Sequence, residues 1–311
     1  MNKTHTVFID GQAGTTGLQI KQRLSNHPYI QLLEIESENR KNVAVRKELM
    51  SNADVTILCL PDDAAKEAVQ ISHGTGTRIL DASSAHRTHT DWAYGYPELN
   101  HTQRTLINTS TYVANPGCYA TGAIALLAPL IDHHALQAES LLSINAVSGF
   151  SGGGNKMIDR YQTSDAPIGF SPYGLAFDHK HIPEIQEWSG LINRPLFQPA
   201  VGNFKQGMLV FIPLNFTHES EKIVSTLMNH YEHEKFVKVV SVSDESAREY
   251  VLNPEDLNNS NKLELYVFSS KKTGQTLLAA KLDNLGKGAS GAAVQNLNIM
   301  LGFDEAICVN I

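Results

Sequence analysis

Short apolar runs alternate with helical patterns along the first third of the chain. Runs of this kind are typical of buried strands, and the stretches between them repeat their apolar residues with the period of a helix. Strands separated by short helices predict a parallel sheet with right-handed crossovers. The four predicted strands span residues 7–9, 30–35, 55–60 and 78–81.

Two helices are expected between these strands. The first follows residue 17, carries Leu18, Ile20 and Leu24 on its apolar side, and ends before Pro28. The second opens at Asp62, where an acidic residue suits the positive end of the helix dipole. This part of the chain is therefore predicted to form a doubly wound α/β domain of the Rossmann type.

After about residue 140 the pattern changes, because strand-like runs follow one another closely. Such bunching predicts an α+β domain with a mostly antiparallel sheet. The predicted strands span residues 141–147, 208–216, 236–242, 263–268 and 276–282. The last segment, 287–301, is predicted as a helix with Ala289, Ala293, Leu297 and Leu301 on one face.

Composition limits the classes of function. The chain has 311 residues, 42% of them hydrophobic, which suits two packed domains rather than a disordered protein. Its net charge of −7 disfavours nucleic acid as a partner. The longest apolar stretch, 121–131, is shorter than a membrane span, and the first residues show no secretory signal. We therefore expect a soluble, cytoplasmic protein without a membrane partner.

Three glycines form a G-x-x-G-x-x-G pattern between the first predicted strand and the first helix. Gly11, Gly14 and Gly17, with Thr15 and Thr16 among them, allow a tight turn whose backbone N–H groups can hold a diphosphate. The spacing differs from the usual G-x-G-x-x-G fingerprint, so a glycine-rich turn without a ligand is the alternative. The strand before the pattern and the helix after it favour a dinucleotide site.

The segment after the second strand carries signals for both nicotinamide coenzymes. Ser37, Arg40 and Lys41 favour the 2′-phosphate of NADP, whereas Glu36 and Glu38 are acidic residues of the kind that hold a free ribose hydroxyl. We predict NADP(H), with a solvated polar loop as the alternative.

Cys118 follows Asn-Pro-Gly and precedes an apolar helix predicted over 119–131. Free backbone N–H groups and the dipole at a helix start favour a thiolate and can hold an oxyanion at an attacked carbonyl. Cys118 is therefore the candidate nucleophile, while Cys59, inside a strand, and Cys308, near the end, are expected to be structural. Three cysteines far apart do not indicate a disulfide framework.

A proton partner for the thiol is expected in the His-Lys-His-Ile-Pro-Glu segment. His181 is the candidate base, and Glu184, three residues on, lies on the same side of a helical turn and is the candidate residue that orients it. His179 is the alternative base. No cysteine or carboxylate cluster has a familiar zinc spacing, so no metal is predicted.

Taken together, these segments resemble the N-acetyl-γ-glutamyl-phosphate reductase family, in its shorter subfamily. The resemblance extends over nearly the whole chain, and aspartate-semialdehyde dehydrogenases match its motifs less well. The motifs that carry it are the glycine pattern at 11–17, NPGCYAT at 115–121, SGFSGGG at 148–154, HKHIPE at 179–184 and DNLGKGASG at 283–291.

The resemblance implies NADPH-dependent reduction of an acyl phosphate, N-acetyl-γ-glutamyl phosphate, to the semialdehyde in arginine biosynthesis. Cys118 would form a thioester, and His181 would act as acid and base. It also implies a homo-oligomer, dimer or tetramer. The residues expected near the substrate are Arg87, Ser148, Gly149, Ser151 and Lys156. Those expected on the nicotinamide side are Asn284, Gly286 and Gly288.

The expected domains are residues 1–117 for NADP, completed by 286–311, and residues 118–285 for catalysis and oligomerisation. Three alternatives stay open: a reductase of aspartyl phosphate, a reductase of an aminoadipyl analogue, and a sensor of NADP without catalysis. A single methylene in the substrate changes binding by only ~1–3 kcal/mol, so the sequence does not decide the chain length.

Overall fold

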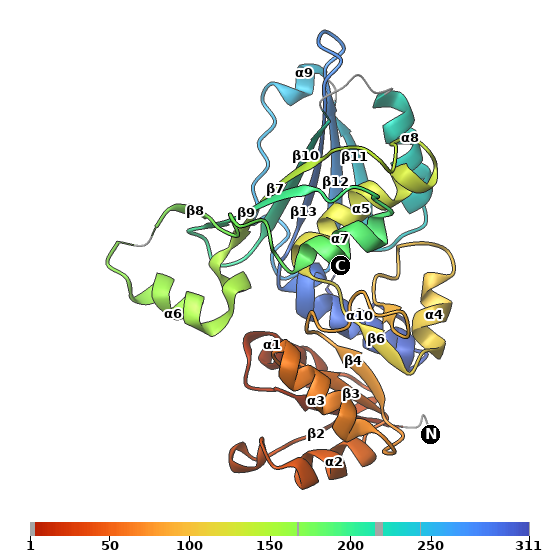
Figure 1. Cartoon of the computed structure of the whole chain (residues 1–311), viewed down its shortest axis with the longest axis vertical. Coiled ribbons are helices and arrows are strands. Elements are labelled where there is room, and N and C mark those ends of the chain that lie inside the picture. The colour runs from red at the N-terminus through yellow and green to blue at the C-terminus, as the bar shows by residue number, and fades with distance from the viewer. Residues whose placement is uncertain (1–3, 167, 215–219, 243, 311) are drawn as a thin grey trace. The chain divides into compact units, whose positions relative to one another are not determined.

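The computed structural model describes residues 4–166, 168–214, 220–242 and 244–310. The chain divides into two compact units (Figure 1). Unit 1 consists of Met1–Gly117 with Ala289–Asn310, and unit 2 consists of Cys118–Gly288. The chain thus leaves unit 1 immediately before Cys118 and returns to it immediately after Gly288.

Unit 1 contains a six-stranded parallel sheet in the order β2-β1-β3-β4-β6-β5. The doubly wound fold predicted for this region is confirmed. The second and third strands end two residues earlier than predicted, the third because the chain turns at Pro61 into a helix. The strands are β1 His5–Asp10, β2 Ile30–Leu33, β3 Val55–Leu58, β4 Arg78–Asp81, β5 Ala93–Tyr94 and β6 Tyr112–Ala114.

The apolar pattern did not predict two helices of unit 1, α2 and α4. Helix α2 is weakly amphipathic, and its start is capped by Asn42, whose side chain accepts hydrogen bonds from the N–H groups of Ala44 and Val45. The helices are α1 Thr15–Leu24, α2 Val43–Ser51, α3 Asp62–Ser72, α4 Gln103–Thr109 and α10 Gly291–Met300, with a 3₁₀ turn at Ser37–Asn39.

The last helix differs from its prediction. A π-helical turn spans Gly286–Ser290, and α10 then packs against α1 and α4 with all its residues buried, not with one apolar face alone. Its amide side chains are buried because they bond inside unit 1: Asn296 donates to Gly95 O and Asn115 Oδ1, and Asn298 donates to Ile307 O. Hydropathy treats such residues as exposed, which explains the error.

Unit 2 contains a seven-stranded mixed sheet in the order β11-β12-β13-β10-β7-β9-β8. Four neighbouring pairs are antiparallel and two are parallel, so the mostly antiparallel prediction is confirmed. One of the predicted strands spans residues 208–216, and its last two residues, 215 and 216, lie outside the described residues. The strands are β7 Ser143–Gly149, β8 Phe170–Pro172, β9 Leu196–Gly202, β10 Met208–Leu214, β11 Val237–Val242, β12 Leu263–Ser269 and β13 Thr276–Leu282.

The central helix of unit 2 is α5, Cys118–Asp132, which begins at the cysteine itself. It packs against β10 and β13, where a Cβ at Gly122 would lie 3.0 Å from Val210 Cγ2. The other helices are α6 Gly154–Thr163, α7 His181–Ser189, α8 Ser220–Tyr231 and α9 Asp244–Ala247, with a 3₁₀ turn at Phe150–Gly153. In Figure 1, α6 and β8 project together from the sheet of unit 2; we call residues 154–172 the arm.

Among the described residues, no helix has both the length and the apolar character that crossing a membrane requires.

Candidate active site

The glycine loop of unit 1 follows the end of β1. Gly11 has φ +94°, and a Cβ on it would lie 2.3 Å from the carbonyl oxygen of Cys59. A Cβ on Gly17 would lie 2.4 Å from Gly11 O. Both positions therefore require glycine for the fold itself, the first for its backbone conformation and both for close packing.

Gly14 is different, because the chain itself leaves room for a side chain there. A Cβ on Gly14 would have its nearest contact at 3.6 Å, an ordinary van der Waals distance. Gly14 precedes the first residue of α1, and no side chain caps this helix start. Room for a side chain at the start of a helix, where the first backbone N–H groups point along the axis, suits a bound diphosphate, so the loop fits a dinucleotide coenzyme.

The loop expected to meet the coenzyme's ribose lies beside the glycine loop. The side chain of Gln12 donates a hydrogen bond of 2.9 Å to Ile35 O, which joins the two loops. Ser37 opens the 3₁₀ turn, and Ser37 and Arg40 are both exposed. Their exposure leaves both side chains accessible to a phosphate group at this edge of the sheet.

Cys118 is the first residue of α5 and is partly buried. A Cβ on Gly288 would lie 2.7 Å from the Cβ of Cys118, so the turn at Gly286–Ser290 packs directly against the cysteine. Gly288 donates its N–H to Asp283 O at 2.9 Å. Glycine at 288 thus allows the chain to pass over the candidate nucleophile.

Aromatic and histidine rings gather beside Cys118 in unit 2. Tyr119 lies with its ring 5.8 Å from that of His181 and 5.9 Å from that of His179. Its hydroxyl donates to Ala200 O at 3.1 Å and lies 3.4 Å from the hydroxyl of Tyr173. These contacts place both candidate bases around the residue next to the cysteine.

The two tyrosines remain protonated at neutral pH. Burial raises the pKa of Tyr119 well above its ordinary value and raises the pKa of Tyr173 to about 12, and the charge of Cys118 adds to both shifts. Both hydroxyls therefore act as donors: that of Tyr173 donates to the Tyr119 oxygen, and that of Tyr119 donates to Ala200 O. Neither tyrosine was predicted to have a role; the position of Tyr119 directly after Cys118 was the available signal, and Tyr173 had none.

The histidines at the start of α7 differ in their bonding. The Nδ1 of His179 accepts the backbone N–H of His181 at 3.1 Å, and His179 O accepts the N–H of Ile182 at 2.9 Å. His179 thus stabilises the first turn of α7. His181 and Glu184 are both buried, one helical turn apart.

The loop at Ser148–Gly154 is fixed by backbone and side-chain bonds. Ser148 and Ser151 are buried, and Ser151 N donates to Lys205 O at 3.0 Å. Asn284 donates to Ser151 Oγ at 3.0 Å and accepts the N–H of Gly207 at 2.8 Å. Both ends of the Asn284 side chain are therefore engaged inside unit 2, where they hold the loop.

The buried carboxylate of Asp283 organises the segment before the π-helical turn. It accepts the N–H of Asn259 at 2.8 Å and that of Leu285 at 2.9 Å, and it also binds the side chain of Gln206. Burial raises its pKa, and these hydrogen bonds oppose the rise. A Cβ on Gly286 would lie 2.0 Å from Ser260 O, so this glycine too is required by packing.

Arg87 and Lys156, both expected near an anionic group, lie in different surroundings. Arg87 is buried in unit 1 and donates to Asn115 O at 3.0 Å and to Ala82 O at 3.3 Å. Lys156 is exposed in the first turn of α6 in unit 2. Arg87 therefore supports the backbone ahead of the cysteine, since Asn115 begins the Asn-Pro-Gly-Cys segment.

Asn115 forms hydrogen bonds in four directions within unit 1. Its N–H donates to Asp81 O at 2.8 Å and its Nδ2 to Ala289 O at 3.1 Å. Its oxygens accept from Arg87 and from Asn296. The segment that leads to Cys118 is thereby joined to the segment that returns after Gly288.

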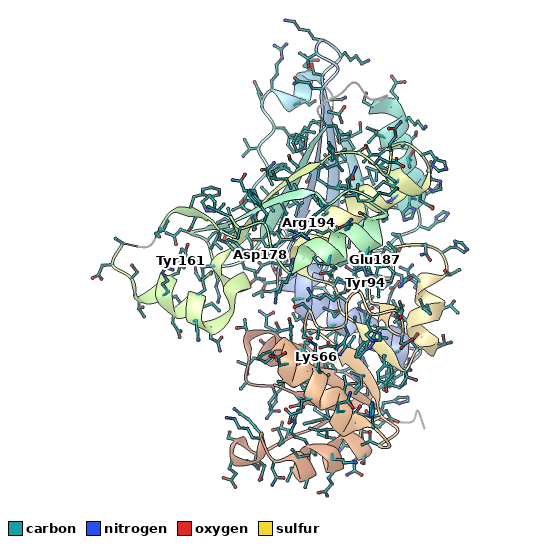
Figure 2. All side chains as sticks on the ribbon, viewed as in Figure 1. Lys66, Tyr94, Tyr161, Asp178, Glu187 and Arg194 are labelled. Carbon is teal, nitrogen blue, oxygen red and sulfur yellow. The ribbon has the colours of Figure 1, made fainter. Side chains whose placement is uncertain are left out.

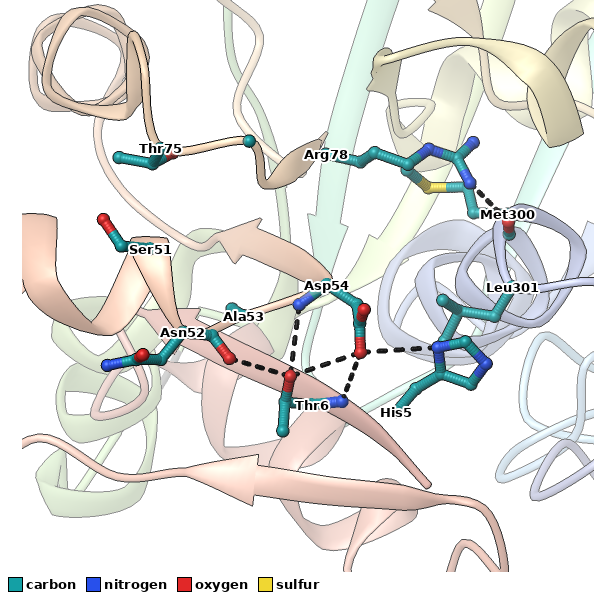
Figure 3. Close-up of a pocket in the computed structure, with 11 residues that line it drawn as sticks. His5, Thr6, Ser51, Asn52, Ala53, Asp54, Thr75, Arg78, Met300 and Leu301 are labelled. Atoms are coloured by element: carbon teal, nitrogen blue, oxygen red, sulfur yellow. Dashed lines mark hydrogen bonds and ion pairs between the residues drawn. The ribbon is translucent and has the colours of Figure 1, made fainter. Parts of the chain in front are cut away.

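A cavity of about 470 Å³ lies at the opposite, amino-terminal edge of the unit 1 sheet (Figure 3). Asp54 on its wall accepts the N–H of Thr6 at 2.8 Å and lies 3.4 Å from His5 Nδ1. Arg78 bonds to Met300 O at the end of α10. These groups join β1 to the residue before β3, and β4 to α10, and the cavity is separate from the glycine loop.

The two sequence regions match two family models. Residues 6–106 match the model described as semialdehyde dehydrogenase, NAD binding domain, and residues 118–284 match semialdehyde dehydrogenase, dimerisation domain. The chain is 48% identical to N-acetyl-gamma-glutamyl-phosphate reductase of Trichormus variabilis, with 99% of each chain covered. It is 45% identical to that of Burkholderia cenocepacia, with 97% of this chain and 98% of the relative covered. The chain belongs to the N-acetyl-γ-glutamyl-phosphate reductase family.

Solved structures of more distant proteins share the fold of this family. A probable aspartate-semialdehyde dehydrogenase of Pseudomonas aeruginosa has a TM-score of 0.71 at 13% identity, covering 96% of this chain and 99% of its own. Aspartate semialdehyde dehydrogenase with NADP from Candida albicans has a TM-score of 0.68 at 14% identity, covering 98% and 100%. The family resemblance and the oxidoreductase class inferred from the motifs are confirmed.

Proposed function

We propose that this protein reduces N-acetyl-γ-glutamyl phosphate to N-acetylglutamate semialdehyde and phosphate with NADPH, as a step of arginine biosynthesis. The observation that carries the proposal is the cysteine at the start of α5, beside a buried tyrosine, a partly buried tyrosine and two histidines. Reductase relatives at 45–48% identity over nearly the full length support the same substrate.

Cys118 supplies the nucleophile. Its thiolate attacks the acyl carbon, the bond to the phosphate oxygen breaks, and phosphate leaves with the electron pair, so that a thioester forms. Backbone N–H groups in the first turn of α5 stabilise both the thiolate and the oxygen that becomes negative. NADPH supplies the hydride when it is bound.

His181 moves the proton. It takes the proton of the thiol, gives it to the carbonyl oxygen as negative charge develops there, and takes it back when the carbon–sulfur bond breaks. We prefer His181 to His179 because Nδ1 of His179 already accepts the N–H of residue 181. Glu184, buried one turn later, orients His181.

The coenzyme binds to unit 1 through the glycine loop. Gly14, Thr15 and Thr16 face the diphosphate at the start of α1, and exposed Ser37 and Arg40 hold the 2′-phosphate. The room for a side chain at Gly14 supports this placement, because packing requires glycine at the other two glycine positions of the loop and not at this one.

The substrate binds to unit 2 along the Ser148–Gly154 loop. Ser148, Gly149 and Ser151 line it, and Lys156 and Arg87 are the proposed partners of its phosphate or carboxylate. Gly286 and Gly288 bring backbone to the nicotinamide side, while Asn284 acts by holding the loop.

We further propose that the protein forms a homo-oligomer through unit 2. Large apolar side chains are exposed there, at Leu175, Phe177, Ile192 and Leu196. An exposed apolar surface of this kind favours association, and the model matched by unit 2 describes a dimerisation domain. Cytoplasmic location belongs to the same proposal, since the chemistry needs a reduced cysteine.

The test is the reverse reaction with N-acetylglutamate semialdehyde, phosphate and NADP⁺, followed by coenzyme absorbance. We expect turnover that requires phosphate and that exceeds turnover with aspartate semialdehyde and with the aminoadipyl analogue. Equal or faster turnover of aspartate semialdehyde or of the aminoadipyl analogue would identify that compound, rather than N-acetylglutamate semialdehyde, as the substrate. Coenzyme binding without any turnover would indicate a sensor instead.

A further inference from the structure

A cavity of about 200 Å³ lies in unit 2 between α6 and β8, inside the arm. Figure 2 shows Tyr161, one of its lining residues, on this projecting part of the unit. Helix α6 and strands β8 and β9 supply side chains to its walls, as do residues before and after β8. The lining residues are Met157, Arg160, Tyr161, Ser164, Ala166, Ile168, Ser171, Tyr173 and Val201.

The cavity borders the residues around Cys118. Tyr173 lines it, and the hydroxyl of Tyr173 lies 3.4 Å from that of Tyr119, the residue after the cysteine. On the opposite strand, Val201 lines the cavity, and its neighbour Ala200 accepts the Tyr119 hydroxyl at 3.1 Å. Tyr173 and the strand that carries Val201 therefore contact both the cavity and the side chain of Tyr119, the residue after Cys118.

The residues that line the cavity combine one charged side chain with apolar and hydroxyl-bearing side chains. Among the described residues that line the cavity, Arg160 alone is charged at neutral pH. Met157, Ile168 and Val201 supply apolar surface, and serine and tyrosine hydroxyls supply hydrogen-bonding groups. This combination suits a small ligand that carries one carboxylate, one amide and one methyl group.

The arm is attached to the loop proposed to hold the substrate. The ring of Tyr161 on α6 stacks on Phe150 with a centroid separation of 5.0 Å. Gly154, with φ +71°, allows the chain to turn from that loop into α6. Arg160 is thus carried on an element whose position is coupled to the Ser148–Gly154 loop.

We propose that this cavity binds the N-acetylated amino-acid end of the substrate and that Arg160 pairs with its α-carboxylate. The inference rests on the proposed function, in which the other end of the same molecule reacts at Cys118. A guanidinium can bind a carboxylate through two parallel hydrogen bonds, and the apolar side chains would surround the acetyl methyl group. Arg160 would therefore determine specificity for substrates with this end group.

The experiment compares wild type, Arg160→Leu and Arg160→Lys in the reverse reaction. Two substrates are used: N-acetylglutamate semialdehyde and its α-carboxamide, which lacks the charge. With the natural substrate, we expect Arg160→Leu to raise KM about 10- to 100-fold while kcat changes less than about threefold, and Arg160→Lys to recover part of the loss. With the carboxamide, all three proteins should have similar, high KM values.

The control is Arg248→Leu, an exposed arginine of unit 2 outside the cavity, which should leave both constants unchanged. Melting curves establish that the variants fold. A KM for the natural substrate that stays within about twofold in Arg160→Leu would overturn the assignment, as would a carboxamide penalty that persists in that variant. If wild type does not turn over the natural substrate at all, the proposed function fails instead, and the two failures are distinct.

Discussion

In unit 1 the candidate site for the coenzyme's diphosphate is one continuous segment, residues 11–17, whereas the candidate cysteine site of unit 2 is assembled from segments spread between 118 and 288. The first is built mainly of backbone, with glycine required at Gly11 and Gly17. The second is built of side chains that meet only after the chain has folded. Substitutions in the glycine loop should therefore mainly change coenzyme binding, whereas substitutions around Cys118 should mainly change the rate of the chemical step.

The largest expected effect is at the nucleophile. Cys118→Ser should lower kcat by about 10⁴-fold or more, because the hydroxyl is far harder to ionise, and should leave the Kd for NADP⁺ in unit 1 unchanged. Steady-state rates and fluorescence titration measure the two quantities. Cys308→Ser is the matched control with near-normal activity. Undiminished turnover in Cys118→Ser would remove this residue from the mechanism.

Cys59 and Cys118 should differ strongly in reactivity. Burial raises the pKa of Cys59 to about 12, so at pH 8 only about 10⁻⁴ of it is thiolate. Iodoacetamide at pH 7–9 should label Cys118 and leave Cys59 unmodified until the chain is unfolded. Mass spectrometry of peptides reports both sites. Rapid labelling of Cys59 in the folded protein would contradict its placement beneath the glycine loop.

The two histidines should separate chemistry from structure. His181→Asn should lower turnover by about 10²-fold or more and abolish the acidic limb of the pH profile, because a general base acts only when it is deprotonated, with little change in melting temperature. His179→Ala should mainly lower stability, by about 1 kcal/mol, through the lost bond to the first turn of α7. If the pH profile changes in His179→Ala and not in His181→Asn, the roles are reversed.

The smallest expected effect tests the glycine loop. Gly14→Ala should fold normally, since its Cβ meets nothing closer than 3.6 Å, yet should raise the Kd for NADP⁺ about 10-fold by occupying the diphosphate's place. Gly11→Ala is the contrast: it should lose about 2–4 kcal/mol of stability, because of its positive φ and its clash with Cys59 O. Unchanged binding in Gly14→Ala would place the coenzyme elsewhere.

The contrast between a site formed by one segment and a site assembled from distant segments also explains which features could be predicted from the sequence. Four of the six strands of unit 1, the glycine loop and the helix beginning at Cys118 depend on local patterns, and they were predictable. The identity of the candidate nucleophile followed from a single segment of four residues. These features need no knowledge of which distant residues come together.

Other features depend on long-range contacts. Tyr173 reaches Tyr119 only through the pairing of β8 with β9, and Asn284 reaches Ser151 across 133 positions of sequence. The buried amides of α10 lie outside its predicted apolar face, and their burial could not be predicted because their partners, such as Gly95, lie far back in the chain. Periodicity records burial of apolar groups and misses buried polar groups that are fully bonded.

The return of the chain to unit 1 has a consequence for synthesis on the ribosome. Helix α10 is made after residues 118–288, yet it covers α1 and α4, and its final carbonyl at Met300 binds Arg78, the first residue of β4. Until residues 291–300 have left the ribosome, the first-made half of the molecule lacks part of its interior, while residues 118–288 already have their whole sheet. Unit 1 is therefore completed after unit 2, and a truncation that removes residues 291–311 would leave the coenzyme-binding half, rather than the cysteine half, exposed to proteolysis.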